Sequence, residues 1–182
     1  MIDGLEFFLG RPIVIAIAGS NGAGKSTFFA THLADSGLRF INADVLAAEL
    51  QIGPYEAADV AASLRAALIS RGESFVFETV LSDPVGDKVD TLASYAEAGY
   101  TVVLIYIAIQ DAAISIERVS MRVSQGGHDV PDEKLQTRFA RTQANLKRAI
   151  ERLPHVMVYA NTDLERPYRL VQRYEHGKPI RA

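Results

Sequence analysis

The 182-residue sequence contains no cysteine, and only five of its nineteen basic residues are lysine. The absence of cysteine excludes a disulfide scaffold, a cysteine nucleophile and any zinc or iron–sulfur site held by thiolates. The longest apolar run, residues 102–109, is too short to cross a membrane as a helix. The first ten residues lack the basic region of a signal peptide, so we expect a cytoplasmic protein with no membrane partner.

The formal net charge of −3 is too small to indicate a nucleic-acid partner, but the charges are unevenly distributed. Residues 26–110 carry eleven acidic and four basic residues, a balance that would repel a polyanion. Residues 111–152 instead hold six arginines and two lysines. Because the arginine fork suits phosphate recognition, we expect phosphate to be handled there and expect no nucleic-acid partner.

Strand-like and helix-like segments alternate along the whole chain. Apolar, β-branched runs predict strands, and segments bounded by proline or glycine predict helices. Buried strands that alternate with helices favour an α/β fold with a mainly parallel sheet covered on both faces. We therefore expect one domain over residues 1–182. Strands are predicted at 13–18, 38–41, 74–78, 100–109 and 156–159, with a possible sixth at 170–174, and helices at 26–35, 43–50, 55–71, 84–98, 111–124 and 131–153.

The segment between the first strand and the first helix matches the pattern G-x-x-x-x-G-K-[ST] without a mismatch. Phosphate oxygens must be met there by backbone N–H groups at close range, which excludes side chains at the first and last glycine. The lysine should reach the β- and γ-phosphates, and the serine hydroxyl should bind Mg²⁺. We predict a P-loop NTPase of the nucleoside-kinase-like, three-layer type that binds ATP or GTP with Mg²⁺ through Gly19, Ser20, Asn21, Gly22, Ala23, Gly24, Lys25, Ser26 and Thr27.

Two acidic residues follow neighbouring predicted strands. Asp44 comes just after the second strand, and Glu78 ends the third. We expect both strands to lie beside the P-loop strand, which would bring both carboxylates to the edge of the sheet where ligands bind. A carboxylate there can accept the proton of an attacking hydroxyl or orient Mg²⁺. The alternatives are a first-turn acid of the next helix for Asp44 and a salt-bridged acid for Glu78.

Four arginines stand at helical spacing on the last two long helices. Arg118 and Arg122 are four residues apart and Arg138 and Arg141 are three apart, so each pair shares a helix face. With the glycine-containing loop between the helices, residues 111–152 are typical of a lid that closes over a nucleotide. The alternative is that the arginines are solvated. Asn161, after the fifth strand, either hydrogen-bonds the nucleotide base or belongs to a simple turn.

The combination of GSNGAGKST, FINAD, FVFETVLS and RVSQGGHDVP, followed by Arg138 and Arg141, resembles the zeta toxin family of P-loop kinases over about residues 13–161. The resemblance implies phosphorylation of UDP-N-acetylglucosamine on a sugar hydroxyl, using ATP or GTP and Mg²⁺. It also implies that Asp44 is the general base and that Glu78 lies at the sugar-nucleotide site. The family's lid arginines correspond to Arg118 or Arg122 and to Arg138 or Arg141.

One position departs from the family pattern. Well-known zeta toxins have an arginine four residues after the third-strand acid, where it helps to hold the sugar nucleotide. This chain has Ser82 there, in the segment from Thr79 to Ser82 that we expect to contact the acceptor.

The motifs and the resemblance together predict a kinase of a small acceptor, first of all a nucleotide sugar. The alternatives are a kinase of another small molecule, such as an antibiotic (chloramphenicol phosphotransferases share the architecture), or a nucleotide switch that regulates a partner; an antitoxin partner cannot be read from the sequence.

Overall fold

The computed structural model describes residues 12–124 and 130–180. The loop predicted between the two arginine-bearing helices lies largely outside these residues. In the described part, strands and helices alternate as the sequence predicts, and most boundaries agree within three residues. The elements are β1 Ile13–Ala18, α1 Lys25–His32, the 3₁₀ turn η2 Ala34–Ser36, β2 Arg39–Ile41, α2 Ala43–Leu50, α3 Pro54–Ser70, β3 Phe75–Thr79, α4 Asp87–Glu97, β4 Thr101–Ala108, α5 Ala112–Ser124, α6 Asp132–Arg152, β5 His155–Ala160, β6 Arg169–Glu175 and β7 Lys178–Ile180.

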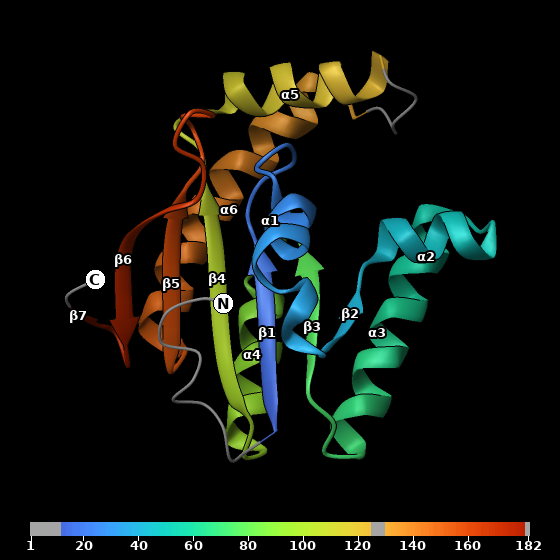
Figure 1. Cartoon of the computed structure of the whole chain (residues 1–182), viewed down its shortest axis with the longest axis vertical. Helices are drawn as coiled ribbons and strands as arrows, with labels where there is room; N and C mark the ends of the chain where they lie inside the picture. Colours follow the sequence, from blue (N-terminus) through green and yellow to red (C-terminus); the bar gives the residue numbers. More distant parts are fainter. Residues whose placement is uncertain (1–11, 125–129, 181–182) are drawn as a thin grey trace.

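The strands form one sheet in the order β2-β3-β1-β4-β5-β6-β7 (Figure 1). The first five strands are parallel, and β6 and β7 continue the sheet antiparallel to β5. The predicted α/β fold with a mainly parallel sheet is confirmed, and β6 is the possible sixth strand. The sequence predicts about five strands with a possible sixth, whereas the sheet of the described residues has seven; the three-residue β7 was not predicted because it contains Pro179 and has no recognisable strand pattern.

Only one of the two strands that we expected beside the P-loop strand β1 pairs with it. β3 pairs directly with β1, with Ile17 opposite Glu78 and Ala18 opposite Thr79. β2 pairs with β3 and not with β1, so it lies one strand further out. The prediction that the second strand also lies beside the P-loop strand is therefore wrong. Local apolar patterns identify strands, but their order depends on how the crossover helices pack.

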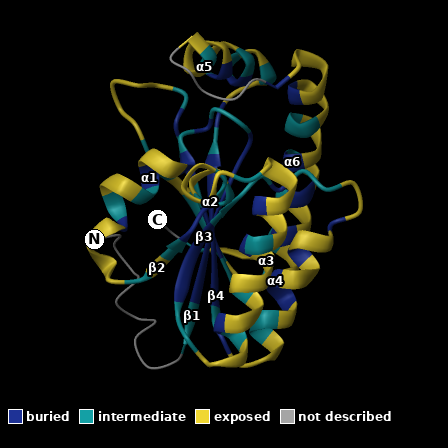
Figure 2. Ribbon diagram, turned by 90° about the vertical axis from the view of Figure 1, so that its right-hand side faces the viewer, coloured by how far each residue is buried: buried dark blue, intermediate teal, exposed yellow. Residues whose placement is uncertain are grey.

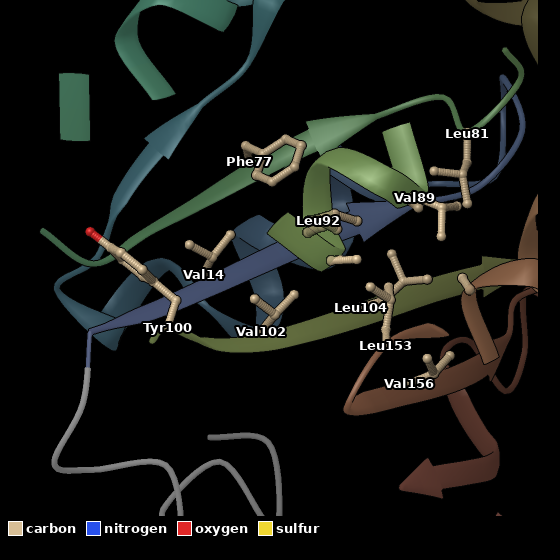
Figure 3. Close-up of a cluster of buried hydrophobic side chains, with 14 of the residues drawn as sticks. Val14, Phe77, Leu81, Val89, Leu92, Tyr100, Val102, Leu104, Leu153 and Val156 are labelled. Atoms are coloured by element: carbon tan, nitrogen blue, oxygen red, sulfur yellow. The ribbon is translucent and has the colours of Figure 1, made fainter. Parts of the chain in front are cut away.

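Helices cover both faces of the sheet, as the three-layer prediction requires. On one face, side chains of α3, α4 and α6 pack against the strands; Figure 3 shows this cluster, which includes Leu92, Leu104 and Leu153. On the other face, Phe28 and Leu33 close a second cluster with the remaining strand side chains. Figure 2 shows buried strands at the centre and exposed outer helix faces. The resulting frame fixes the carboxyl ends of β1, β3 and β4 at one edge.

Helix α4 starts three residues later than predicted. The predicted start at Pro84 fails because Gly86 takes a left-handed conformation with φ of 92° and caps the helix. The Asp83 carboxylate accepts a hydrogen bond from the Gly86 N–H and holds this turn. Within the described residues, no helix combines the length and apolarity that spanning a membrane would need.

Candidate active site

The glycine-rich loop from Gly19 to Gly24 connects β1 to α1 at the carboxyl edge of the sheet (Figure 1). Two of its glycines have no room for a side chain. A Cβ atom on Gly19 would lie 2.5 Å from the Ile107 carbonyl oxygen of β4. A Cβ atom on Gly24 would lie 2.6 Å from Asn161 Nδ2 and 2.7 Å from the Tyr168 hydroxyl. The loop is therefore held tightly from outside, with α1 directing its N-terminus toward the loop.

Lys25 begins α1 and is almost fully buried. Its ammonium donates a hydrogen bond to the Ser20 carbonyl oxygen at 3.0 Å and lies 3.6 Å from Glu78 Oε1. Burial lowers the pKa of Lys25, while the negative charges of Glu78 and Asp44 oppose that shift and Arg122 adds to it. The charges of two predicted acids, Glu78 and Asp44, and of one predicted arginine, Arg122, therefore all act on the Lys25 ammonium.

Glu78 connects the P-loop to the neighbouring strands. Its Oε2 atom accepts hydrogen bonds from the Ser26 hydroxyl at 2.6 Å and from Asn42 Nδ2 at 2.9 Å. The Ser26 hydroxyl and the Glu78 carboxylate offer the hard oxygen ligands that Mg²⁺ prefers. The described residues contain no cluster of three or more His, Asp or Glu side chains for a metal. A site with few protein ligands suits Mg²⁺, which is usually held by one or two carboxylates together with substrate phosphates.

Asp44 lies in the first turn of α2, next to this group. Asn42 caps the helix, because its Oδ1 accepts hydrogen bonds from the backbone N–H groups of Asp44 and Val45. Asn42 is buried while Asp44 is exposed, so the carboxylate faces solvent at the edge of the sheet. Asn42 was not predicted; its side chain fixes both the start of α2 and the position of Glu78.

The predicted base contact, Asn161, touches the P-loop itself. Its Nδ2 atom donates a hydrogen bond to the Ala23 carbonyl oxygen at 2.8 Å. Its Oδ1 atom is buried and has no hydrogen-bond partner among the described residues. A buried amide oxygen without a partner can accept a hydrogen bond from an N–H group of a ligand. The contact with a base stays a prediction.

The two arginines of α5 have different environments. The guanidinium of Arg118 donates hydrogen bonds to the carbonyl oxygens of Asn161 at 2.8 Å and Thr162 at 3.1 Å. Arg122 is exposed, and its charge acts on Lys25. The two arginines stand one helical turn apart, but the Arg118 guanidinium is bonded to backbone carbonyls while the charge of Arg122 acts on Lys25.

An open hollow of about 630 Å³ lies between the segment after β3 and the start of α6. Ser82 lines one side, and the predicted lid arginines Arg138 and Arg141 line the other. The remaining lining residues are Pro131, Glu133, Lys134 and Thr137. Ser82 and the second arginine pair, which are far apart in the sequence, are thus brought together.

A group of cations near this hollow was not predicted from the sequence. The Lys88 ammonium donates a hydrogen bond to the Val80 carbonyl oxygen at 2.6 Å, although Lys88 as a residue is exposed. Desolvation of the ammonium lowers the pKa of Lys88; Asp83 opposes the shift, whereas Arg65, Arg138 and Lys25 add to it. Arg65 also stacks over Phe77, 4.8 Å from the ring centre. The acidic total of residues 26–110 hides this local positive charge.

Comparison with known proteins agrees with the fold. The family model described as zeta toxin matches residues 51–170, more than half of the chain. The native complex of AvrRxo1-ORF1 with AvrRxo1-ORF2 contains a chain with a TM-score of 0.74 at 18% identity, covering 97% of this chain and 62% of that one. The chain therefore spans less than two thirds of that relative. No curated protein sequence matches.

Two further structures have the same fold. The PezAT chromosomal toxin–antitoxin system of Streptococcus pneumoniae gives a TM-score of 0.69 at 18% identity, covering 93% of this chain and 77% of the other. A putative kinase from Chloroflexus aurantiacus gives 0.55 at 17% identity, covering 74% and 80%. The family match confirms the resemblance drawn from the sequence motifs. The chain belongs to the zeta toxin family, and its fold is that of the matched structures.

Proposed function

We propose that the chain is a kinase that transfers the γ-phosphate of ATP or GTP to a hydroxyl of a small, phosphate-bearing acceptor, first of all UDP-N-acetylglucosamine. One observation carries this proposal. Glu78 contacts Ser26 and Lys25 of the P-loop, and the segment that follows it leads to a hollow lined by Arg138 and Arg141. Hydrolysis of a nucleotide needs only water as acceptor. A hollow lined by three cations and one acid, four residues along the chain from Glu78, suits a second, anionic substrate.

On the donor side, Lys25 and the N–H groups of the P-loop bind the nucleotide phosphates. Ser26 and Glu78 would hold Mg²⁺, which supplies charge neutralisation at the phosphates. Arg122 acts on Lys25 from α5 and stabilises negative charge on the transferring group. A crystal structure of the AvrRxo1-ORF1:-ORF2 complex with ATP supports nucleotide binding by this fold.

On the acceptor side, Asp44 accepts the proton of the attacking hydroxyl, since its exposed carboxylate is near enough for its charge to act on Lys25. Thr79 and Ser82 contact the acceptor, with Glu78 orienting it from the neighbouring strand. Lys88, Arg65 and Arg138 bind the acceptor phosphates. Lys88 thereby supplies the cation that family members have at the position of Ser82.

The test is incubation of the chain with γ-labelled ATP and UDP-N-acetylglucosamine, and then with a metabolite extract, followed by mass spectrometry. We expect one labelled product carrying one additional phosphate on a hydroxyl. A Lys25→Met variant gives the background. Label found only in inorganic phosphate, with every acceptor unmodified, would refute the kinase proposal. A labelled neutral acceptor such as chloramphenicol, with phosphate-bearing compounds unchanged, would refute the acceptor class.

We also propose that the chain binds an antitoxin protein. The support is its structural likeness to PezAT, a toxin–antitoxin system. Co-expression with the product of the adjacent gene should yield a complex on size-exclusion chromatography that has lost the kinase activity. Separate elution of two unassociated proteins would count against this partner.

A further inference from the structure

Three side chains from outside the P-loop donate hydrogen bonds to its backbone carbonyls. The Ser115 hydroxyl of α5 donates to the Asn21 carbonyl oxygen at 2.7 Å. Asn161 Nδ2, just after β5, donates to the Ala23 carbonyl oxygen at 2.8 Å. The Tyr168 hydroxyl, just before β6, donates to the Gly24 carbonyl oxygen at 2.9 Å. The three donors are more than 90 residues away from the loop in sequence, so the contacts are tertiary.

These contacts determine the direction of the backbone N–H groups. In a planar trans peptide unit, the carbonyl oxygen and the N–H of the next residue point to opposite sides. Holding the carbonyls of residues 21, 23 and 24 outward therefore turns the N–H groups of residues 22, 24 and 25 to the other side of the loop. Phosphate is bound by such N–H groups in a P-loop. The three side chains thus present the loop in its phosphate-binding form.

The loop needs this support because it is rich in glycine. Gly22 has a φ of 72° and Gly24 a φ of 91°, and glycine has the largest conformational freedom to lose on ordering. Hydrogen bonds from fixed side chains restrict that freedom before a ligand arrives. A preordered site binds its ligand more tightly, because less ordering remains to be done on binding.

The donors themselves are held rigidly. Ser115 and Asn161 are buried. Tyr168 has a φ of 55°, a backbone conformation uncommon outside glycine. Its ring packs edge-on against Phe28 of α1, with the ring centres 5.2 Å apart. Such a conformation persists where the surroundings fix it, and it is enriched at ligand sites.

The same contacts anchor the first half of α5. Ser115 is bonded to the P-loop, and Arg118 is bonded to the carbonyls of Asn161 and Thr162. This half of α5 therefore forms a fixed wall of the nucleotide site. Any closing of the predicted lid at 111–152 would involve the parts beyond Arg118.

We propose that Ser115, Asn161 and Tyr168 form an outer clamp that positions the P-loop amides for the phosphates of the nucleotide. The clamp residues act through the backbone of the loop and not by touching the phosphates. The inference rests on the proposed function only for nucleotide binding. Its test therefore needs no acceptor.

The experiment compares two single variants with matched controls. Tyr168→Phe removes only the hydroxyl that reaches Gly24, and Ser115→Ala removes only the hydroxyl that reaches Asn21. The controls are Tyr174→Phe, in the β6 strand that follows Tyr168 and packed on the core, and Ser124→Ala, whose hydroxyl donates a hydrogen bond to the Met121 carbonyl oxygen of the same helix. Thermal unfolding identifies variants that remain folded at the titration temperature.

Each protein is titrated with MgATP and with inorganic tripolyphosphate, which carries phosphates but no base. Losing one hydrogen bond that positions the loop should weaken binding roughly three- to tenfold. We expect the same loss for both ligands in Tyr168→Phe and in Ser115→Ala, and no loss in the controls. This pattern would support an action on phosphate binding through the loop.

Three results would overturn the clamp: unchanged affinity for both ligands in folded variants, a loss for ATP alone, or an equal loss in the controls. A loss for ATP alone would mean that these residues contact the base or sugar. If the clamp variants lose affinity as expected but no acceptor is ever phosphorylated, the clamp stands and the kinase proposal fails. The two ideas are therefore separable.

Discussion

Replacing Glu78 with glutamine tests how strongly the buried charges of the site depend on one another. Glu78 Oε1 lies 3.6 Å from the Lys25 ammonium, with exposed fractions of 15% and 6% for the two side chains. Glutamine has the same size and keeps one oxygen for Ser26 and Asn42. It places an uncharged amide beside the buried lysine. The change therefore removes the charge of Glu78 with little change in shape.

The magnitude follows from the distance and the burial. At an effective dielectric constant of about 20, two unit charges this far apart attract by about 4 to 5 kcal/mol. Removing one partner of a buried pair costs about 3 to 5 kcal/mol in measured cases. Asp44 still compensates Lys25, and the Ser20 carbonyl still accepts its hydrogen bond, which reduces the loss. We expect Glu78→Gln to lower the free energy of unfolding by about 2 to 4 kcal/mol.

The assay is urea unfolding followed by circular dichroism, with Glu73→Gln as control. Glu73 pairs with Arg39 at 3.2 Å on the surface, and such pairs contribute at most about 1 kcal/mol. Adding Lys25→Met to Glu78→Gln should recover much of the lost stability, because the uncompensated charge is then gone. Wild-type stability in Glu78→Gln, or a further loss in the double variant, would refute the reasoning about the buried pair.

Two further predictions concern the acceptor cations and the response to pH. Lys88→Met should raise the KM for the phosphate-bearing acceptor by about ten- to a hundredfold, because a hydrogen bond to a charged group contributes about 1.5 to 3 kcal/mol. The KM for ATP should stay unchanged. Lys147→Met, on the exposed face of α6, is the control, and an equal effect from it would contradict a specific role of Lys88. Burial lowers the pKa of His32 from 6.5, so on acidification the unfolded chain takes up a proton that the folded chain resists. The free energy of unfolding should therefore fall as the pH is lowered through 6.5. Urea unfolding at several pH values should show a smaller dependence of stability on pH for His32→Gln than for the wild type. An unchanged dependence would exclude His32 as its source.

The fold was predictable because its signals are local. The apolar run Ile13–Ala18, the P-loop and the helix after it form one continuous pattern; the structure reproduces the strand and starts the helix within one residue, but ends the helix three residues earlier, at His32. The order of β2 and β3 was not predictable, because no local signal states which crossover lies nearer to β1. The start of α4 at Asp87 depends on the capping turn from Asp83 to Gly86, which proline at 84 concealed.

The site residues were predictable where a sequence motif or the end of a strand requires one type of residue. Lys25, Ser26 and Glu78 meet as the motif and the strand ends indicate. Helical spacing grouped the arginines but could not reveal that Arg118 is bonded to backbone carbonyls. Ser115 and Tyr168 carry no motif at all, since their role arises only when α5 and β6 pack around the loop. Lys88 was missed because the net acidic charge of residues 26–110 conceals a single lysine.

The most direct test of the central claim is the rate of phosphoryl transfer by an Asp44→Asn variant at saturating ATP and acceptor. Asp44 is exposed at the start of α2, so its replacement should leave the fold and nucleotide binding intact. Asp59→Asn, an exposed acid of α3, is the control. If Asp44 accepts the proton of the acceptor hydroxyl, transfer should slow by about 10²- to 10⁴-fold with ATP affinity unchanged. A rate near that of the wild type, with ATP still bound, would contradict the account.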